Sequence, residues 1–295
     1  MKTKKAVLVC SNAGLDYIDY PKDIIILRSV IHFGTDESFD DFVEMDAKTF
    51  YERIAKNPND VPKTSYVSIG KMQQIFEQLE NEGYDEALII TIAKPLSGLH
   101  DALVLQAKNF KLKVTVFDSK TIALAEAIQA LTAHKMYSLG FETKEVLKTL
   151  TQISENNKWY FAVDTLKYLV LNGRLSKLGG TLGSLLKIKP LLTFNETGKV
   201  ETVEKIRTTP KALKRVLDKY LEESKDKNVL TFISHAHNDE AVAYFIEEIK
   251  KVYPNRKITS SYLTPVVGAH TGPKAIGIGY LDLDKVEHAN IIEEL

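Results

Sequence analysis

The chain has 295 residues, of which 44% are hydrophobic and 26% charged, as in a globular protein that buries a substantial core. Lysine plus arginine and aspartate plus glutamate both number 39, so the formal net charge is zero, which argues against nucleic acid as the main partner. The single cysteine, Cys10, excludes an intrachain disulfide and favours a reducing compartment.

The apolar segments of the chain are short. The run Ala6 to Cys10 is shorter than the apolar core of a signal peptide, which has about 7–15 residues. No stretch approaches the ~18 apolar residues of a membrane span. We therefore expect a cytoplasmic protein without a membrane span; a transient contact with a membrane surface is left open.

The first half alternates between apolar segments and segments with helical spacing. A long apolar run covers 23–33. Ser68 and Thr143 stand at the start of segments with helical spacing and are predicted to be the N-caps of two helices. Strands are predicted at 6–10, 86–93 and 113–119, and helices at 45–57, 67–83, 97–110, 121–140 and 143–157. This rhythm predicts βαβ units and a mainly parallel sheet.

The second half shows a different pattern of apolar and helical segments. A hairpin over 191–207 is predicted to turn at Asn195–Gly198. Strands are predicted at 228–236 and 257–265, and helices at 209–224 and 238–254. The stretch that begins at Ser261 looks like a strand that ends in a polar loop, Gly268–Pro273. We expect two α/β domains, 1–157 and 158–295, the second with a mixed sheet.

Short polar motifs fall at the ends of the predicted strands. Thr64, Ser65 and Ser68 precede a helix, Leu96-Ser97-Gly98 and Asp118-Ser119 each follow a strand, and His270-Thr271 lies in the last polar loop. In open parallel sheets, ligands bind beyond the carboxyl ends of the strands, and helix starts favour anions. Each motif alone is equally typical of a cap or a turn, and Asp118-Ser119 favours a cap.

Three other patterns point to different chemistry, and each is incomplete. His235 and His237 have the spacing of a metal pair but lack further ligands, so no metal site is predicted. The glycine-rich segment 179–183 lacks the Gly-Lys-Ser/Thr ending of a phosphate-binding loop. Ser97 lacks the G-x-S-x-G pattern of a nucleophile elbow.

Taken together and in order, six motifs resemble those of the DegV family. They are Thr64-Ser65, Leu96-Ser97-Gly98, Asp118-Ser119, Gly173-Arg174-Leu175-Ser176, Ile188-Lys189-Pro190 and Gly268-Ala269-His270-Thr271-Gly272-Pro273. The resemblance covers nearly the whole chain. It implies a non-catalytic carrier that holds one long-chain fatty acid in an apolar tunnel between its domains, without any other cofactor.

The resemblance also implies roles for individual residues. It places the fatty acid carboxyl at Thr64 and Ser97, with Ser65, Gly98, His270 and Thr271 nearby. It places Arg174 at the mouth of the site, where it would serve mainly the encounter with a separate fatty acid kinase subunit that makes the acyl phosphate. Gly268 and Gly272 are expected to let the backbone approach the head group.

The chain departs from the family pattern at several positions. Cys10-Ser11-Asn12 replaces Asp-Ser-Thr, Tyr66 replaces glutamine, Leu99-His100 replaces Thr-Tyr, Lys274 replaces glycine, and 122–129 lacks the usual glycines. Two alternatives to a carrier remain at this point. One is an enzyme that acts on a polar small molecule through His270 and Ser97, and the other is a regulatory protein with an empty cleft.

Overall fold

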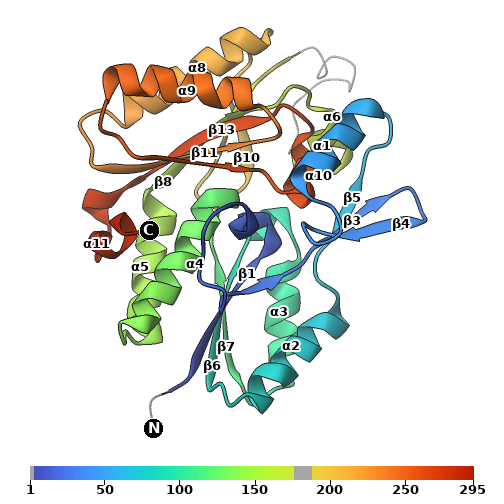
Figure 1. Ribbon diagram of the computed structural model, residues 1–295, viewed down its shortest axis with the longest axis vertical. Coiled ribbons are helices and arrows are strands. Elements are labelled where there is room, and N and C mark those ends of the chain that lie inside the picture. The colour runs from blue at the N-terminus through green and yellow to red at the C-terminus, as the bar shows by residue number, and fades with distance from the viewer. Residues whose placement is uncertain (1–2, 176–187) are drawn as a thin grey trace.

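The structure is a computed structural model that describes residues 3–175 and 188–295. Its first half is built around a parallel sheet with the strand order β2-β1-β6-β7 (Figure 1). The strands are β1 Lys5–Cys10, β2 Ile25–Leu27, β6 Glu86–Thr91 and β7 Lys113–Asp118. Helices α2 Ile69–Asn81 and α3 Leu99–Ala107 pack on one face, and α4 Ala123–Ser138 and α5 Thr143–Asn156 on the other. The predicted parallel sheet is confirmed.

A small antiparallel sheet with the order β4-β3-β5 lies beside the parallel one. It consists of β3 Val30–Phe33, β4 Glu37–Asp40 and β5 Lys63–Ser65, next to α1 Ala47–Lys56. The apolar run 23–33 is therefore divided between two sheets. It breaks at Arg28 and Ser29 because the Arg28 guanidinium pairs with Asp16 and the Ser29 N–H donates to Ser11 Oγ at 3.2 Å.

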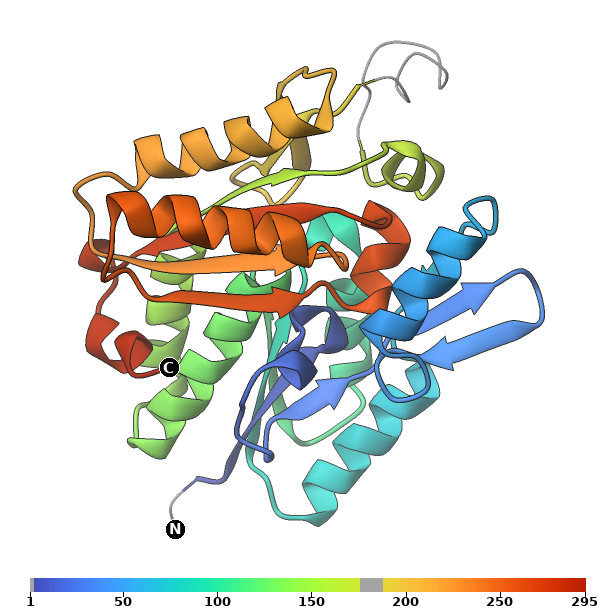
Figure 2. The same cartoon turned by 45° about the horizontal axis from the view of Figure 1, so that its top comes forward.

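The second half contains a six-stranded mixed sheet with the order β10-β9-β8-β13-β11-β12. The strands are β8 Asn157–Ala162, β9 Leu191–Phe194, β10 Val200–Glu204, β11 Val229–His235, β12 Ile258–Tyr262 and β13 Ile276–Asp282. Helices α8 Thr209–Glu223 and α9 Asp239–Val252 cover its outer face (Figure 2). Only β11 and β12 pair in parallel, and β9 and β10 form the predicted hairpin around Asn195–Gly198. The mixed sheet is confirmed.

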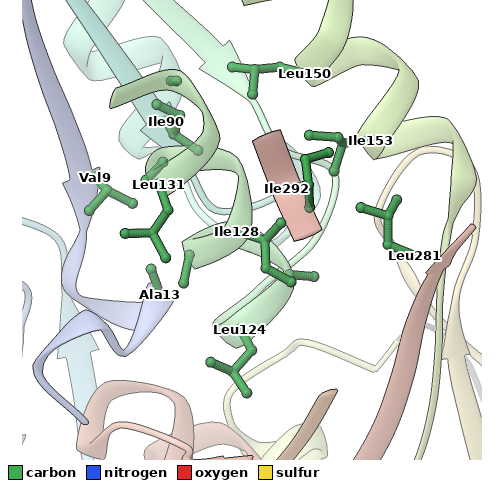
Figure 3. Close-up of a cluster of buried hydrophobic side chains, with 14 of the residues drawn as sticks. Val9, Ala13, Ile90, Leu124, Ile128, Leu131, Leu150, Ile153, Leu281 and Ile292 are labelled. Carbon is green, nitrogen blue, oxygen red and sulfur yellow. The ribbon is translucent and has the colours of Figure 1, made fainter. Parts of the chain in front are cut away.

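Helix α4 joins the two halves through its apolar surface. Leu124, Ile128 and Leu131 pack toward Val9 of β1 on one side and toward the second half on the other (Figure 3). The second half contributes Leu281 of β13 and residues of α11 Ala289–Glu293 to this cluster. Twelve of the sixteen residues of α4 are buried, polar ones among them, as expected of a helix that lies between two layers. Among the described residues, no helix is long and apolar enough to cross a membrane.

The segment after β12 differs from the prediction. Instead of a strand and a polar loop, Pro265–Thr271 forms a helix, α10, with Pro265 in its first turn after the extended Thr264. The last strand is β13, which follows it. Six of the seven residues of α10 are buried, so no polar face marks the helical period in the sequence.

The N-terminus of α5 also differs by one residue. The helix is capped by Glu142, which forms a reciprocal capping box with Glu145, rather than by Thr143. The Thr143 hydroxyl donates instead to the carboxylate of Glu86 on β6. The predicted Ser68 cap of α2 is confirmed, because Ser68 Oγ accepts the Lys71 N–H at 3.3 Å.

Candidate functional site

A pocket of about 430 Å³ lies where the carboxyl ends of the parallel strands face the second half. Each parallel strand is followed by a residue that lines it: Asn12 after β1, Ser29 after β2, Ile92 after β6 and Ile122 after β7. The ends of parallel strands share one edge of a sheet, and the pocket lies at the edge where the sequence predicts a site.

The wall from the second half is mainly apolar. It includes Leu169 of α6 Lys167–Leu171, Phe194 and Val200 of the β9–β10 hairpin, and Val267 of α10. An apolar hollow of about 30 Å³ adjoins the pocket, shares Phe194 with it and reaches Trp159. Sequence motifs did not point to these residues, because each is an ordinary apolar residue of a core element.

The other end of the pocket is polar. All seven candidate residues line it: Thr64, Ser65, Ser97, Gly98, Arg174, His270 and Thr271. Ser65 and Gly98 are exposed at its mouth, and the Ser65 hydroxyl contacts His32 Nε2 at 2.9 Å. The structure thus brings the candidate residues together from four separate segments of the chain.

At this end, the hydroxyl groups of Ser97 and Thr64 each contact a neighbour in a way that leaves the hydroxyl proton free to be donated to a ligand. Ser97 Oγ accepts the Leu99 N–H at 3.2 Å, so its own O–H is free to donate. Thr64 Oγ1 lies 2.8 Å from His270 Nε2. When Nε2 carries the imidazole proton, it donates to Thr64 and directs the threonine O–H away from the ring.

His270 is neutral at physiological pH. Burial, with the positive charge of Arg174 as a second cause, lowers the pKa of His270 to about 4. Its other ring nitrogen, Nδ1, is buried without a hydrogen-bond partner in the described part of the chain. His270 therefore orients Thr64 through Nε2 and does not provide a cation.

The turn after α6 ties the polar segments to one another. Arg174 Nε donates to the carbonyl of Leu96 at 3.2 Å, directly before Ser97. Asn172 Nδ2 donates to the carbonyls of Pro62 at 3.3 Å and Ala269 at 2.9 Å, next to the segments that carry Thr64 and His270. Asn172 was missed from sequence; an Asn-Gly pair predicts a turn but not its contacts.

Gly268 in α10 and Gly272 directly after it lie close to neighbouring helices. A Cβ at Gly268 would lie 2.5 Å from Tyr51 Oη, and a Cβ at Gly272 would lie 2.5 Å from the ring of Tyr168. Gly272 also has a φ of 74°, which favours glycine. These glycines let α10 pack closely on α1 and α6, and their approach to a head group stays a prediction.

The remaining candidates have structural roles or lie elsewhere. Asp118 caps two loops by accepting the Lys94 and Lys120 N–H groups at 3.1 and 3.0 Å. His235 is buried and its Nδ1 accepts the Asn238 N–H at 3.1 Å. Within 3–175 and 188–295, no group of three or more His, Cys, Asp or Glu side chains is placed to hold a metal ion. Ser176 and the glycine-rich segment 179–183 lie outside the described residues.

Comparison with known proteins identifies the family of this chain. The model of the DegV family matches residues 6–283. The chain belongs to the DegV family. Protein DegV of Bacillus subtilis is 34% identical over 246 residues, which cover 82% of this chain and 86% of that protein. A DegV domain-containing protein of Staphylococcus aureus is 30% identical over 283 residues, which cover 94% of this chain and 97% of the relative.

Solved DegV structures share the fold over most of their length. The structure of DegV of Bacillus subtilis, described as a fatty acid binding protein, has 31% identity and a TM-score of 0.83, with 95% of this chain and 99% of that chain covered. A fatty acid binding DegV family protein of Streptococcus agalactiae has 25% identity and a TM-score of 0.85, with the same coverage. The predicted family and fold class are thus confirmed.

Proposed function

We propose that this DegV protein is a carrier that binds one long-chain fatty acid, with the hydrocarbon chain against the apolar wall and the carboxyl at Thr64, Ser97 and Arg174. The observation that carries the proposal is a single pocket with one apolar wall and one polar end. The fatty acid binding of the two similar solved proteins supports it.

The hydrocarbon chain and the carboxylate of a fatty acid are stabilised in a pocket by different interactions. Transfer of the chain from water contributes about 0.8 kcal/mol per buried CH₂ group, so the apolar wall supplies most of the affinity. A buried carboxylate is costly unless it receives hydrogen bonds. The hydroxyls of Ser97 and Thr64 are available as donors, and the half-buried guanidinium of Arg174 adds a positive charge.

We further propose that the bound carboxyl is passed to a separate kinase subunit for acyl-phosphate formation. The polar end carries the exposed residues Ser65 and Gly98, so a partner protein can approach the head group there. Arg174 stands at this end, and a guanidinium suits a phosphate or an acidic partner surface.

The enzyme alternative finds less support in the geometry. A serine nucleophile needs a base within hydrogen-bond reach, but His270 Nε2 is engaged by Thr64 and not by Ser97. With a pKa of about 4, His270 is also a weak general base at neutral pH. The other alternative, a regulatory protein with an empty cleft, is separated from a carrier by a direct binding measurement.

The test is calorimetric titration of lipid-free protein with palmitate. We expect one site per chain and a loss of about 1–3 kcal/mol in binding free energy for Ser97→Ala, because one hydrogen bond to the buried head group is removed. Ser260→Ala, at an exposed position of β12, is the matched control and should bind like the parent. Unchanged affinity in Ser97→Ala would remove Ser97 from the site, and no binding at all would contradict the proposal.

A further inference from the structure

Two almost fully buried polar side chains line the pocket outside the set that the sequence motifs indicate. Asn12, in the short helix Ser11–Ala13, is 4% exposed, and Ser29, between β2 and β3, is 5% exposed. Among the described residues, Asn12 bonds through its Nδ2 and Ser29 through its backbone, so the Asn12 side-chain oxygen and the Ser29 hydroxyl are left for the cavity. Buried polar atoms of this kind need a partner.

A buried carboxyl group fixes the orientation of Asn12. Asn12 Nδ2 donates to Glu126 Oε2 on α4. Glu126 is fully buried, and its second oxygen, Oε1, has no partner within the described ranges. Burial raises the pKa of Glu126 well above its ordinary value. Because the amide nitrogen is occupied by Glu126, Asn12 presents its oxygen to the pocket.

The position of these two residues relative to the head group follows from the pairing of β3 with β5. Val30, which follows Ser29, pairs with Ser65, a residue of the polar end. The Ser29 N–H donates to Ser11 Oγ at 3.2 Å, so Asn12, which follows Ser11, lies next to Ser29. Asn12 and Ser29 therefore lie beside the polar end, near the carbons that follow the carboxyl.

We propose that Asn12 and Ser29 form a subsite for a hydroxyl group on the acyl chain, a few carbons from the carboxyl, so that the preferred ligand class is a hydroxylated fatty acid. This inference rests on the proposed fatty acid binding. A ligand hydroxyl both donates and accepts, so it pairs with the Asn12 oxygen and the Ser29 O–H together. A CH₂ group at the same place leaves both polar atoms unpaired in a buried site.

The experiment compares ligands of equal length on lipid-free protein. The parent is titrated with palmitate, 3-hydroxypalmitate, 5-hydroxypalmitate and 16-hydroxypalmitate. We expect the 3- or the 5-hydroxy acid to bind about three- to tenfold more tightly than palmitate, as one or two added hydrogen bonds allow. The 16-hydroxy acid should bind more weakly than palmitate, because its hydroxyl enters the apolar part of the pocket.

Two variants then test whether the preference for a hydroxylated acid depends on Ser29 and Asn12. Ser29→Ala should abolish the preference, because it removes the O–H that pairs with the ligand hydroxyl, whereas the exposed control Ser260→Ala should retain the preference. Asn12→Ser serves as a second variant and should reduce the preference as well.

The outcomes separate this inference from the proposed function. If palmitate binds to the parent at least as tightly as both carboxyl-proximal hydroxy acids, or if Ser29→Ala keeps the preference, the hydroxyl subsite is wrong while fatty acid binding stands. If none of the four acids binds to the parent, the proposed function fails and the subsite fails with it.

Discussion

Replacing Asp41 by asparagine should make the folded protein more stable at pH 8. Asp41 follows β4, is fully buried, and has one carboxylate oxygen, Oδ2, without a partner in the described part of the chain. Burial, partly offset by hydrogen bonds, raises the pKa of Asp41 from 3.8 to about 7. The folded carboxyl thus keeps a proton up to about pH 7, whereas the unfolded carboxyl loses it near pH 4.

The sign and size of the effect follow from proton linkage. Where the folded state binds more protons than the unfolded state, the free energy of unfolding falls as pH rises, by about 1.36 kcal/mol per pH unit. For Asp41 this decline runs from about pH 4 to pH 7 and then stops. Between pH 5 and pH 8 the parent should therefore lose about 3 kcal/mol that Asp41→Asn does not lose.

Urea denaturation of both proteins at pH 5, 6, 7 and 8 measures this difference. Other titrating groups are common to both proteins and cancel in the comparison. Asp36→Asn, at an exposed position, is the control and should follow the parent at every pH. If the gap between parent and Asp41→Asn is the same at pH 5 and pH 8, the carboxyl does not titrate in this range and the reasoning is refuted.

Three further predictions concern the site and its support. Gly268→Ala should destabilise the fold by about 1–3 kcal/mol and weaken palmitate binding, because a Cβ would lie 2.5 Å from Tyr51 Oη and move α10; equal melting curves would contradict it. Arg174→Ala should weaken palmitate binding several-fold, since Arg174 lines the pocket, and should also reduce acyl-phosphate formation with a kinase. Unchanged palmitate affinity would show that Arg174 does not hold the carboxyl and would leave it only the role toward the kinase. Lys274→Gly should stabilise the fold by about 0.5–1 kcal/mol, because Lys274 has a φ of 61°, and lower stability in urea would contradict this.

The sequence predicts the elements whose pattern is local. The helix that begins after Ser68 has its cap, and the hairpin at Asn195–Gly198 has turn residues between two apolar segments. Helix α10 could not be predicted in this way, because burial on all sides leaves no polar face. The break at Arg28 depends on Asp16 and on Ser11, which are distant in sequence, so its local pattern suggests one continuous segment.

The candidate site was also predicted only where local sequence patterns indicate its residues. Residues such as Ser97 are found from sequence because they follow strands of one parallel sheet, whose carboxyl ends meet at one edge. Phe194 and Asn172 act through contacts between the two halves, and no local pattern encodes such contacts. Asn12 is visible in the sequence only as a departure from the family motif, and its pairing with Glu126 requires the fold.

The central claim is that the pocket holds a fatty acid, and mass spectrometry of the ligand extracted from purified protein tests it most directly. The parent should yield close to one fatty acid per chain after denaturing extraction, and Ser97→Ala should yield clearly less. Repeated extraction of no fatty acid from the parent, together with no uptake of added fatty acid by the lipid-free protein, would contradict the account.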